Sequence, residues 1–277
     1  MVCADDYGLS RGIDEVIDRL VGAGRLGALS CITQGPAWQQ DAHRVASLRQ
    51  QARVGLHFNL TEGQPLSASL RQRWARFPAL GPLLLKAHLG ALPRAAIEDE
   101  LQAQVAAFED ASGCRPDFID GHQHVHHLPG VRQAVLRWAA HRQLPVRSTA
   151  RVAGPASAFK ARVIEHSGGR ALARALAVRS LPHNPVLLGA YDFVQADYRS
   201  LMQAWLAQVP AAGALLFCHP GPAASLATGD VIAAAREREA AYLGSDAFAQ
   251  DLADAGVQLG PIWPQAAGFS PRTTSAG

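Results

Sequence analysis

The sequence predicts an α/β fold with a largely parallel sheet, arranged as a distorted (β/α) barrel that forms a single domain over residues 1–277. Short apolar runs alternate with segments of helical periodicity along most of the chain. No low-complexity linker, long charge run or fixed-period repeat divides it. The length of 277 residues suits a barrel-type fold. An open, doubly wound sheet is the alternative.

The expected strands are short and apolar, and the expected helices have amphipathic periodicity. The strands are expected at Val2–Asp5, Ala28–Thr33, Val54–Phe58, Phe118–Gly121, Pro145–Ser148, Val186–Leu188, Ala214–Cys218 and Val257–Leu259. The helices are expected at Gly12–Ala23, Asp41–Gln50, Arg94–Ser112, Val131–His141, Ala161–Ala177, Tyr198–Gln208 and Val231–Tyr242.

Three further segments have distinct signals. Gly113 follows the expected Arg94–Ser112 helix at the position of a C-cap, and Pro116 prevents the helix from continuing. The stretch 66–93 is rich in Pro, Leu and Arg without a clear period, and we expect it to be an insertion or a lid over the site. We expect residues 265–277 to form a disordered tail.

Composition argues against several functional classes. A formal net charge of +3 is too small, for a chain of 277 residues, to indicate a nucleic-acid partner. No apolar run is long enough to predict a membrane span, and no signal peptide is visible at the N-terminus. The four cysteines are scattered without a Cys-x-x-Cys pair, which favours buried thiols over disulfides and therefore a cytoplasmic protein. The sequence allows a homodimer.

Polar residues follow several of the expected strands, and both candidate architectures place their active sites at the carboxyl ends of strands. Asp5 and Asp6 follow the first strand, so one carboxylate could bind a metal while the other polarises a water molecule. Alternatively, one of them caps the helix that begins near Gly12, aided by Ser10. His57 ends the third strand, where a single histidine is more often structural than a ligand.

The segment Asp120–His127 carries four of the 11 histidines of the chain within six positions. In extended chain His122, His124 and His126 would share one face. Neutral imidazole is the commonest nitrogen ligand of divalent metals, so the cluster predicts a metal site. One oxygen ligand and two histidines would leave positions free for water and substrate, as a catalytic site requires.

Two further strand ends carry single polar residues. His219 follows the apolar run Ala214–Cys218 and precedes a Pro-Gly break, which suggests a general acid or base opposite the metal. Arg147 ends the fifth strand and could hold a substrate group, although a structural salt bridge is the more usual role of such a residue.

Four strings together resemble the YdjC-like carbohydrate deacetylases, also called the ChbG/HpnK family. They are ADDYGLS (4–10), GLHFNLTEGQPL (55–66), DGHQHVHHLPGV (120–131) and CHPG (218–221), in the order and roughly the spacing of the family. The resemblance implies a distorted barrel, one divalent metal and hydrolysis of the acetamide of an N-acetylated sugar. It further implies a fuller first strand than Met1–Ala4, which is all that precedes the aspartate pair here.

Carried over residue by residue, the resemblance makes Asp6, His57 and His122 the metal ligands, Asp5 the base and His219 the acid. His124, His126 and Arg147 become candidates for contacts to the substrate or to the ligands. The resemblance implies Mg or Zn, and the expected mixed donor set also suits Mn, Co or Ni. Segment 66–93 matches no motif, so the resemblance does not identify the particular sugar.

Two rival functions remain open at this stage. A metal-dependent phosphoesterase can also use His-x-His strings at barrel strand ends, but such sites usually hold several metals and a group of cations for phosphate. A non-catalytic protein that senses a metal or binds a sugar is the second rival. A purely structural metal would not require the additional carboxylate of Asp5.

Overall fold

The structure is a computed structural model that describes residues 1–155, 158–222 and 230–264. Six strands form one sheet in which every pair is parallel, in the order β4-β3-β2-β1-β6-β5. These strands are β1 (Val2–Tyr7), β2 (Ala28–Cys31), β3 (Arg53–Phe58), β4 (Ile119–Gly121), β5 (Leu187–Leu188) and β6 (Leu215–Cys218). The predicted parallel α/β fold is therefore confirmed.

The sheet of the described residues is a curled half-barrel of six strands, not the eight predicted. The expected strand Pro145–Ser148 makes only an isolated bridge from Val146 to Ile119, and Val257–Leu259 is not a strand. After Arg147, the backbone groups of Ser148 bind the side chain of Asn184 and not a neighbouring strand. Asn184 Oδ1 accepts from the Ser148 N–H at 2.7 Å, and Asn184 Nδ2 donates to the Ser148 carbonyl at 2.9 Å.

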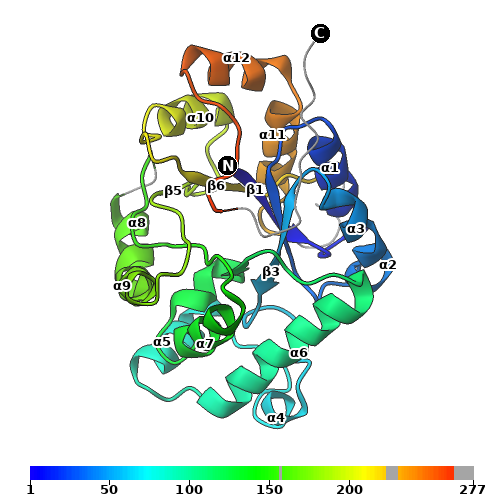
Figure 1. Cartoon of the computed structure of the whole chain (residues 1–277), viewed down its shortest axis with the longest axis vertical. Coiled ribbons are helices and arrows are strands. Elements are labelled where there is room, and N and C mark those ends of the chain that lie inside the picture. Colours follow the sequence, from blue (N-terminus) through cyan, green and yellow to red (C-terminus); the bar gives the residue numbers. More distant parts are fainter. Residues whose placement is uncertain (156–157, 223–229, 265–277) are drawn as a thin grey trace.

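Helices surround the sheet (Figure 1). The longer ones are α1 (Arg11–Gly22), α5 (Leu80–His88), α6 (Arg94–Ser112), α7 (Arg132–Arg142), α9 (Arg170–Val178), α10 (Tyr198–Leu206), α11 (Ala233–Leu243) and α12 (Asp246–Asp254). Four are a single turn or two, namely α2 (Trp38–Asp41), α3 (Val45–Leu48), α4 (Ala68–Arg71) and α8 (Ala158–Ile164). None of the described helices is long and apolar enough to cross a membrane.

Two helix predictions and the prediction for segment 66–93 need correction. The expected helix Asp41–Gln50 is a set of short pieces, in which a 3-10 turn, η1 (Ala42–Arg44), joins α2 to α3. The expected helix Ala161–Ala177 is divided by a π turn, η3 (Glu165–Gly169), in which Gly168 is non-helical. A Cβ on Gly168 would lie 2.1 Å from the carbonyl oxygen of His127, so close backbone packing imposes the break. Segment 66–93, predicted without periodicity, contains α4 and α5.

The core lies between the sheet and the helices. Every residue of β1 is buried, so its two carboxylates are buried as well. Helix α1 presents Ile13, Ile17 and Leu20 to this core, as its amphipathic pattern requires. β1 continues to Tyr7, so it is longer than the Val2–Asp5 strand expected from the sequence. All four cysteines are free, and Cys3, Cys31 and Cys218 are buried, as predicted.

The C-cap of α6 yields a stability prediction. Gly113 has φ +66° and its N–H donates to the Glu109 carbonyl at 2.9 Å, while a Cβ there would meet no atom within 4 Å. Gly113→Ala should therefore lower the free energy of unfolding by about 1–2 kcal/mol through backbone strain alone. Gly22→Ala, in the equally open last turn of α1, should leave stability unchanged or raise it by up to about 1 kcal/mol. Urea denaturation measures both, and shifts of the same sign would contradict the assignment.

Candidate metal centre

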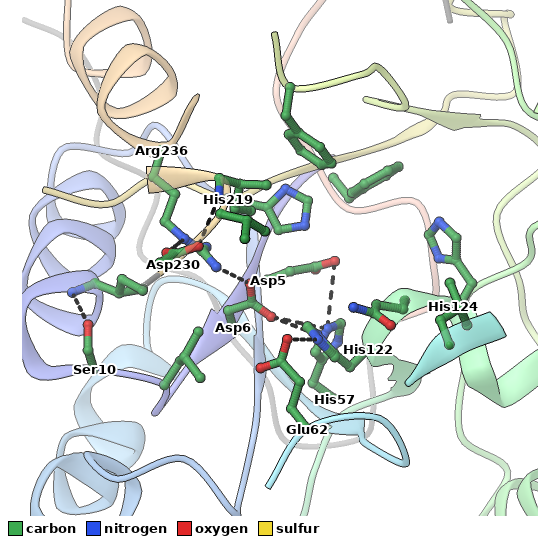
Figure 2. A pocket seen from close by; sticks show the side chains of 18 of the residues that line it. Asp5, Asp6, Ser10, His57, Glu62, His122, His124, His219, Asp230 and Arg236 are labelled. Carbon is green, nitrogen blue, oxygen red and sulfur yellow. Dashed lines mark hydrogen bonds and ion pairs between the residues drawn. The ribbon is translucent and has the colours of Figure 1, made fainter. Parts of the chain in front are cut away.

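The carboxyl ends of β1, β3, β4 and β6 meet at one edge of the sheet, beside a cavity of about 1010 Å³. Asp5, Asp6, His57, His122 and His219 all line this cavity, although 214 residues separate the first from the last. Figure 2 shows them pointing toward a common space. Leu80 and Leu84 of α5, from the segment expected to be an insertion or lid, line the same cavity.

An irregularity in β1 lets two successive carboxylates face the site. The register with β2 shifts between Ala4 and Tyr7, and Asp6 has φ +69°, in the left-handed region. Aspartate tolerates this conformation better than most residues, although it is strained. The bulge interrupts the alternation of side chains along the strand, so Asp5 and Asp6 both reach the site.

The two aspartates do not cap α1, so the alternative interpretation of this pair is wrong. Ser10 is the N-cap residue, and its hydroxyl accepts from the Ile13 N–H at 3.4 Å. Asp14, one turn into the helix, accepts from the Gly8 N–H at 2.6 Å. The carboxylates of Asp5 and Asp6 are left to contact side chains from other strands.

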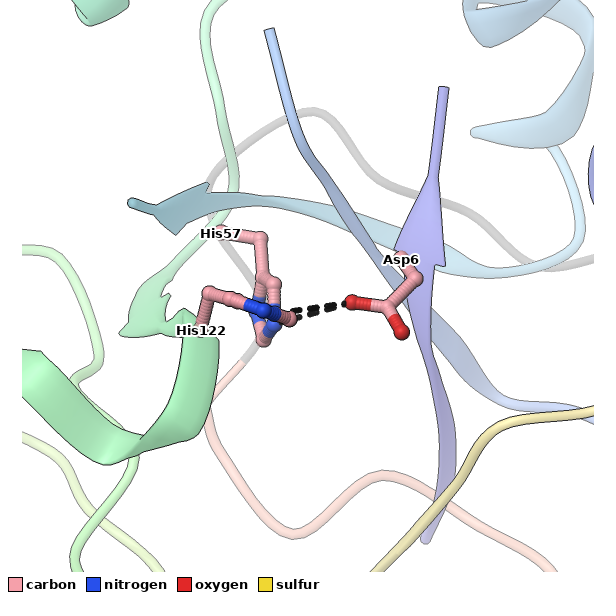
Figure 3. Close-up of side chains that lie close together, drawn as sticks. All are labelled: Asp6, His57 and His122. Atoms are coloured by element: carbon pink, nitrogen blue, oxygen red, sulfur yellow. Dashed lines mark hydrogen bonds and ion pairs between the residues drawn. The ribbon is translucent and has the colours of Figure 1, made fainter. Parts of the chain in front are cut away.

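Asp6, His57 and His122 come together as a three-residue cluster (Figure 3). Asp6 Oδ1 lies 3.5 Å from His57 Nε2 and 3.0 Å from His122 Nδ1. One potential ligand atom from each residue lies within 4.8 Å of the other two. All three side chains are buried. This set of one carboxylate oxygen and two imidazole nitrogens has the composition of a catalytic metal site.

Hydrogen bonds on the Nδ1 side of the His57 ring fix its orientation. The register of β3 and β4 pairs His57 with Asp120, and Asp120 Oδ1 accepts from His57 Nδ1–H at 2.7 Å. Ser30 on β2 donates to the same oxygen at 2.5 Å. With the proton on Nδ1, His57 Nε2 presents its lone pair toward Asp6, which is the tautomer that a metal ligand requires.

The charge of the cluster favours a cation. Burial opposes ionisation of Asp6, but Arg236 and His122 hold the pKa of Asp6 well below its usual range. Burial alone would lower the pKa of His122, yet Asp6 and Glu62 raise it to about 10. Two carboxylate oxygens lie against the His122 ring, Asp6 Oδ1 at 3.0 Å from Nδ1 and Glu62 Oε1 at 3.1 Å from Nε2, so negative charge surrounds the cluster. The residues present therefore fit a divalent metal ion.

Asp5 is held by Arg147. Arg147 Nη1 and Nη2 donate to the two oxygens of Asp5 at 2.7 and 2.6 Å, and Nη2 also lies 2.5 Å from Asp120 Oδ2. Cys3, Asp5 and Asp120 form a second group with metal-ligand spacing, but this guanidinium occupies it. Arg147 is fully buried, is not among the residues that line the cavity, and forms salt bridges with Asp5 and Asp120.

His219 lies across the cavity from the histidine pair, as Figure 2 shows. Its backbone N–H donates to Glu239 Oε2 at 2.5 Å, and its ring packs edge-on against Phe193 and Phe217. Burial lowers the pKa of His219 to about 4, although Asp6 and Asp5 act to raise it. The imidazole is therefore neutral at pH 7 in the free protein.

The other histidines of the segment Asp120–His127 point in different directions. The reason is that the chain turns after Gly121 into a 3-10 segment, η2 (His122–His127), in which residues 123 and 124 have a left-handed backbone conformation. The prediction that His122, His124 and His126 share the face of an extended chain is therefore wrong. His124 lines the cavity and packs edge-on against Phe217. His126 is buried and its Nε2–H donates to the Arg147 carbonyl at 2.9 Å, a structural contact.

Three residues that the sequence did not single out contact the cluster. Asp120 orients His57, Glu62 Oε1 lies 3.1 Å from His122 Nε2, and Arg236 Nη2 donates to Asp6 Oδ2 at 2.8 Å. Asp120 and Glu62 belong to the recognised strings, and the pairing of adjacent strand ends could have revealed Asp120. Arg236 comes from the middle of α11, where nothing in the local sequence marks it.

Fold and site together define a parallel α/β protein with a carboxylate–imidazole cluster at the carboxyl edge of its sheet. The profile of the family described as YdjC-like protein matches residues 1–254, and the chain belongs to this family. A crystal structure of a proposed cellobiose-phosphate cleavage protein from Enterococcus faecalis V583 has the same fold. Its TM-score is 0.74 at 19% identity, covering 95% of this chain and 96% of that one.

Two curated relatives show the similarity in sequence. The chain is 36% identical to the chitooligosaccharide deacetylase of Proteus mirabilis (strain HI4320) over 148 residues. These residues make up 53% of this chain and 57% of the relative. It is 36% identical to the carbohydrate deacetylase of Geobacillus stearothermophilus over 149 residues, and these residues make up 53% of this chain and 58% of the relative. The chain thus spans less than two thirds of the length of these relatives.

The buried position of Arg147 leads to a prediction about stability. Arg147→Met leaves Asp5 and Asp120 buried without their common counter-ion, so the free energy of unfolding should fall by about 3–5 kcal/mol. Arg137→Met removes an exposed pair with Glu98 and should change it by less than about 1 kcal/mol. Urea denaturation of both variants gives the comparison. If Arg147→Met lowers the free energy of unfolding as little as Arg137→Met does, Arg147 is not the counter-ion on which Asp5 and Asp120 depend.

Proposed function

We propose that this chain is a metal-dependent hydrolase that removes acetyl groups from N-acetylated sugars or oligosaccharides. The observation that carries the proposal is the convergence of Asp6, His57 and His122 in one cavity with Asp5 and His219. Membership of the YdjC-like family supports it. The names of the curated relatives, chitooligosaccharide deacetylase and carbohydrate deacetylase, support the class of substrate.

In this proposal Asp6, His57 and His122 hold one divalent cation, Mg or Zn, with Mn, Co or Ni as further candidates for the mixed donor set. Such a cation supplies Lewis acidity, which polarises a carbonyl oxygen and makes water a better nucleophile at neutral pH. Arg236 donates to one oxygen of Asp6 and leaves the other to face the two imidazoles. The protein therefore presents Asp6 as a ligand through a single oxygen.

Asp5 is the proposed base. Its Oδ2 lies 4.0 Å from His57 Nε2, so the carboxylate is beside the cluster without belonging to it. The two hydrogen bonds from Arg147 fix the plane of the carboxylate. Asp5 takes a proton from the water whose oxygen forms a bond to the acetyl carbon.

His219 is the proposed acid. Cleavage of the C–N bond releases acetate and a sugar amine, and the leaving nitrogen needs a proton because an amide anion departs poorly. His219 is on the opposite side of the cavity from His57 and His122, where the leaving group would lie. Because its pKa is about 4 in the free protein, His219 starts neutral, so the proton that it gives to the nitrogen is the one that Asp5 takes from the water and that passes to the imidazole before the C–N bond breaks.

The two rivals are less well supported by the described residues. A phosphoesterase usually needs more than one metal, and Arg147 already fills the second group of potential ligands. The cations that line the cavity all have partners: Arg236 is paired with Asp6 and Asp230, Arg11 is paired with Glu15, and Lys160 donates to the Tyr191 carbonyl. A non-catalytic binder would have no use for Asp5 and His219 on either side of the cluster.

An acetate-release assay tests the function directly. Purified protein would be stripped of metal, reloaded with Mg²⁺, Zn²⁺, Mn²⁺, Co²⁺ or Ni²⁺, and offered a panel of N-acetylated sugars that includes chito-oligosaccharides of increasing length. The proposal expects acetate and a free amine in equal amounts, only with metal. Release of phosphate from phosphorylated sugars without acetate from the panel would support the phosphoesterase instead.

The two aspartates are predicted to differ in their effects. Asp5→Asn keeps the shape but removes the basic oxygen, so turnover should fall by roughly 10²-fold or more while metal still binds. Asp6→Asn should instead weaken metal binding. Isothermal titration with Zn²⁺ and acetate release measure the two properties, with circular dichroism to verify folding. If Asp5→Asn loses its metal and Asp6→Asn keeps it, the two roles are reversed.

The acid role of His219 predicts dependence on the leaving group. His219→Ala should severely impair hydrolysis of a sugar acetamide, but much less that of an acetyl ester with an activated phenolic leaving group, which departs without a proton. Steady-state kinetics on both substrates decide the matter. Equal losses would assign His219 a structural or water-positioning role and leave the metal-centred part of the proposal intact.

A further inference from the structure

The loop that follows β3 is held by an extensive polar network outside the catalytic residues. Asn59 Oδ1 accepts from the N–H groups of Thr61 and Glu62, both at 3.0 Å, and Asn59 Nδ2 donates to the Glu62 carbonyl at 2.8 Å. Both backbone polar groups of Glu62 are therefore bound to one buried side chain. This Asx-type turn fixes where the Glu62 side chain begins.

Side chains of α6 hold this Asx-type turn in place. Gln104 Oε1 accepts from the Asn59 N–H at 3.0 Å, and Gln104 Nε2 donates to the Asn59 carbonyl at 2.7 Å and to Glu100 at 2.9 Å. Glu100 is fully buried and accepts from the N–H groups of Leu66 and Ser67 at 3.0 and 2.8 Å. Buried polar groups arranged in this way rigidify the segment that they hold.

What this rigid loop presents to the cavity is Glu62. Its side chain is 47% exposed and lines the cavity, and Oε1 lies 3.1 Å from His122 Nε2. Figure 2 shows the carboxylate beside the His122 ring. The other ring nitrogen, Nδ1, faces Asp6 at 3.0 Å. His122 is thus held between one carboxylate of the cluster and one carboxylate from the Asn59 turn.

We propose that Glu62 is a positioning residue for His122, matching the contact that Asp120 makes with His57. Glu62 Oε1 lies at ion-pair distance, 3.1 Å, from His122 Nε2, so its carboxylate favours a proton on Nε2 and leaves the lone pair of Nδ1 for a cation beside Asp6. Each histidine of the cluster then has its own carboxylate on the nitrogen that faces away from the metal position. The two contacts differ, because Asp120 is buried and Glu62 is open to the cavity.

The inference rests on the proposed metal site but not on the proposed substrate, so metal binding tests it without any turnover. Zn²⁺ titrations would compare the unmodified chain with Glu62→Ala, Glu62→Gln and Glu98→Gln. Glu98 is a matched control, because its side chain is 42% exposed and paired with Arg137 away from the cavity. Co²⁺ absorption spectra of the same proteins report the number and geometry of the ligands.

Glu62→Ala should weaken Zn²⁺ binding by roughly 10- to 100-fold, as for other residues that orient metal-bound histidines. Glu62→Gln keeps a neutral acceptor and should lose less, while Glu98→Gln should bind like the unmodified chain. The Co²⁺ spectrum of Glu62→Gln should keep its shape. Unchanged Zn²⁺ affinity in Glu62→Ala would overturn the inference, and so would a Co²⁺ spectrum showing that a ligand is lost. Failure of the unmodified chain to bind Zn²⁺ or Co²⁺ would overturn the metal site itself.

Discussion

The buried guanidinium of Arg147 is the interaction on which the rest of the site depends. It lies between Asp5 and Asp120 and is the counter-ion that these two buried carboxylates share. Asp120 in turn fixes the tautomer of His57, so one cation orients both the proposed base and a proposed ligand.

Burial opposes ionisation of Asp120, yet Arg147 and His57 hold its pKa below the usual range. This carboxylate therefore contributes stability above its unfolded-state pKa, and the contribution is lost as the pH falls through the lowered folded-state value.

Backbone geometry supplies the second requirement, which is that side chains from separate strands converge. The bulge at the end of β1 and the left-handed conformation of Asp6 let neighbouring carboxylates reach the same space. Parallel pairing in register places His57 beside Asp120. The turn after Gly121 then brings His122 over the end of β3 and directs His126 toward the Arg147 backbone. Local strain at Asp6 and in η2 is thus concentrated where the cluster forms, as is common at functional sites.

Much of this arrangement could be predicted from the sequence, because the signals were local. Alternating apolar runs and helical segments predicted the parallel α/β fold, and the Gly113 C-cap followed from one glycine and one proline. Asp6, His57 and His122 were recognisable because each stands at a strand end in a distinctive string. Their roles as ligands stay predictions. That the sheet stays a half-barrel was not predictable, since the expected strand Pro145–Ser148 makes only an isolated bridge and the backbone groups of Ser148 bind Asn184, 36 residues later in the chain. The contact between Arg236 and Asp6 spans 230 residues and depends on how α11 packs against the sheet, which no local pattern reveals.

The central claim is that Asp6, His57 and His122 form a site for one divalent metal. Anomalous diffraction from crystals grown with Zn²⁺ or Co²⁺, recorded above and below the absorption edge, tests it most directly. The account predicts a single strong anomalous peak per chain, within bonding distance of an Asp6 oxygen, His57 Nε2 and His122 Nδ1, with Arg147 still bound to Asp5 and Asp120. A peak among Cys3, Asp5 and Asp120, or two peaks of equal strength in the cavity, would contradict it.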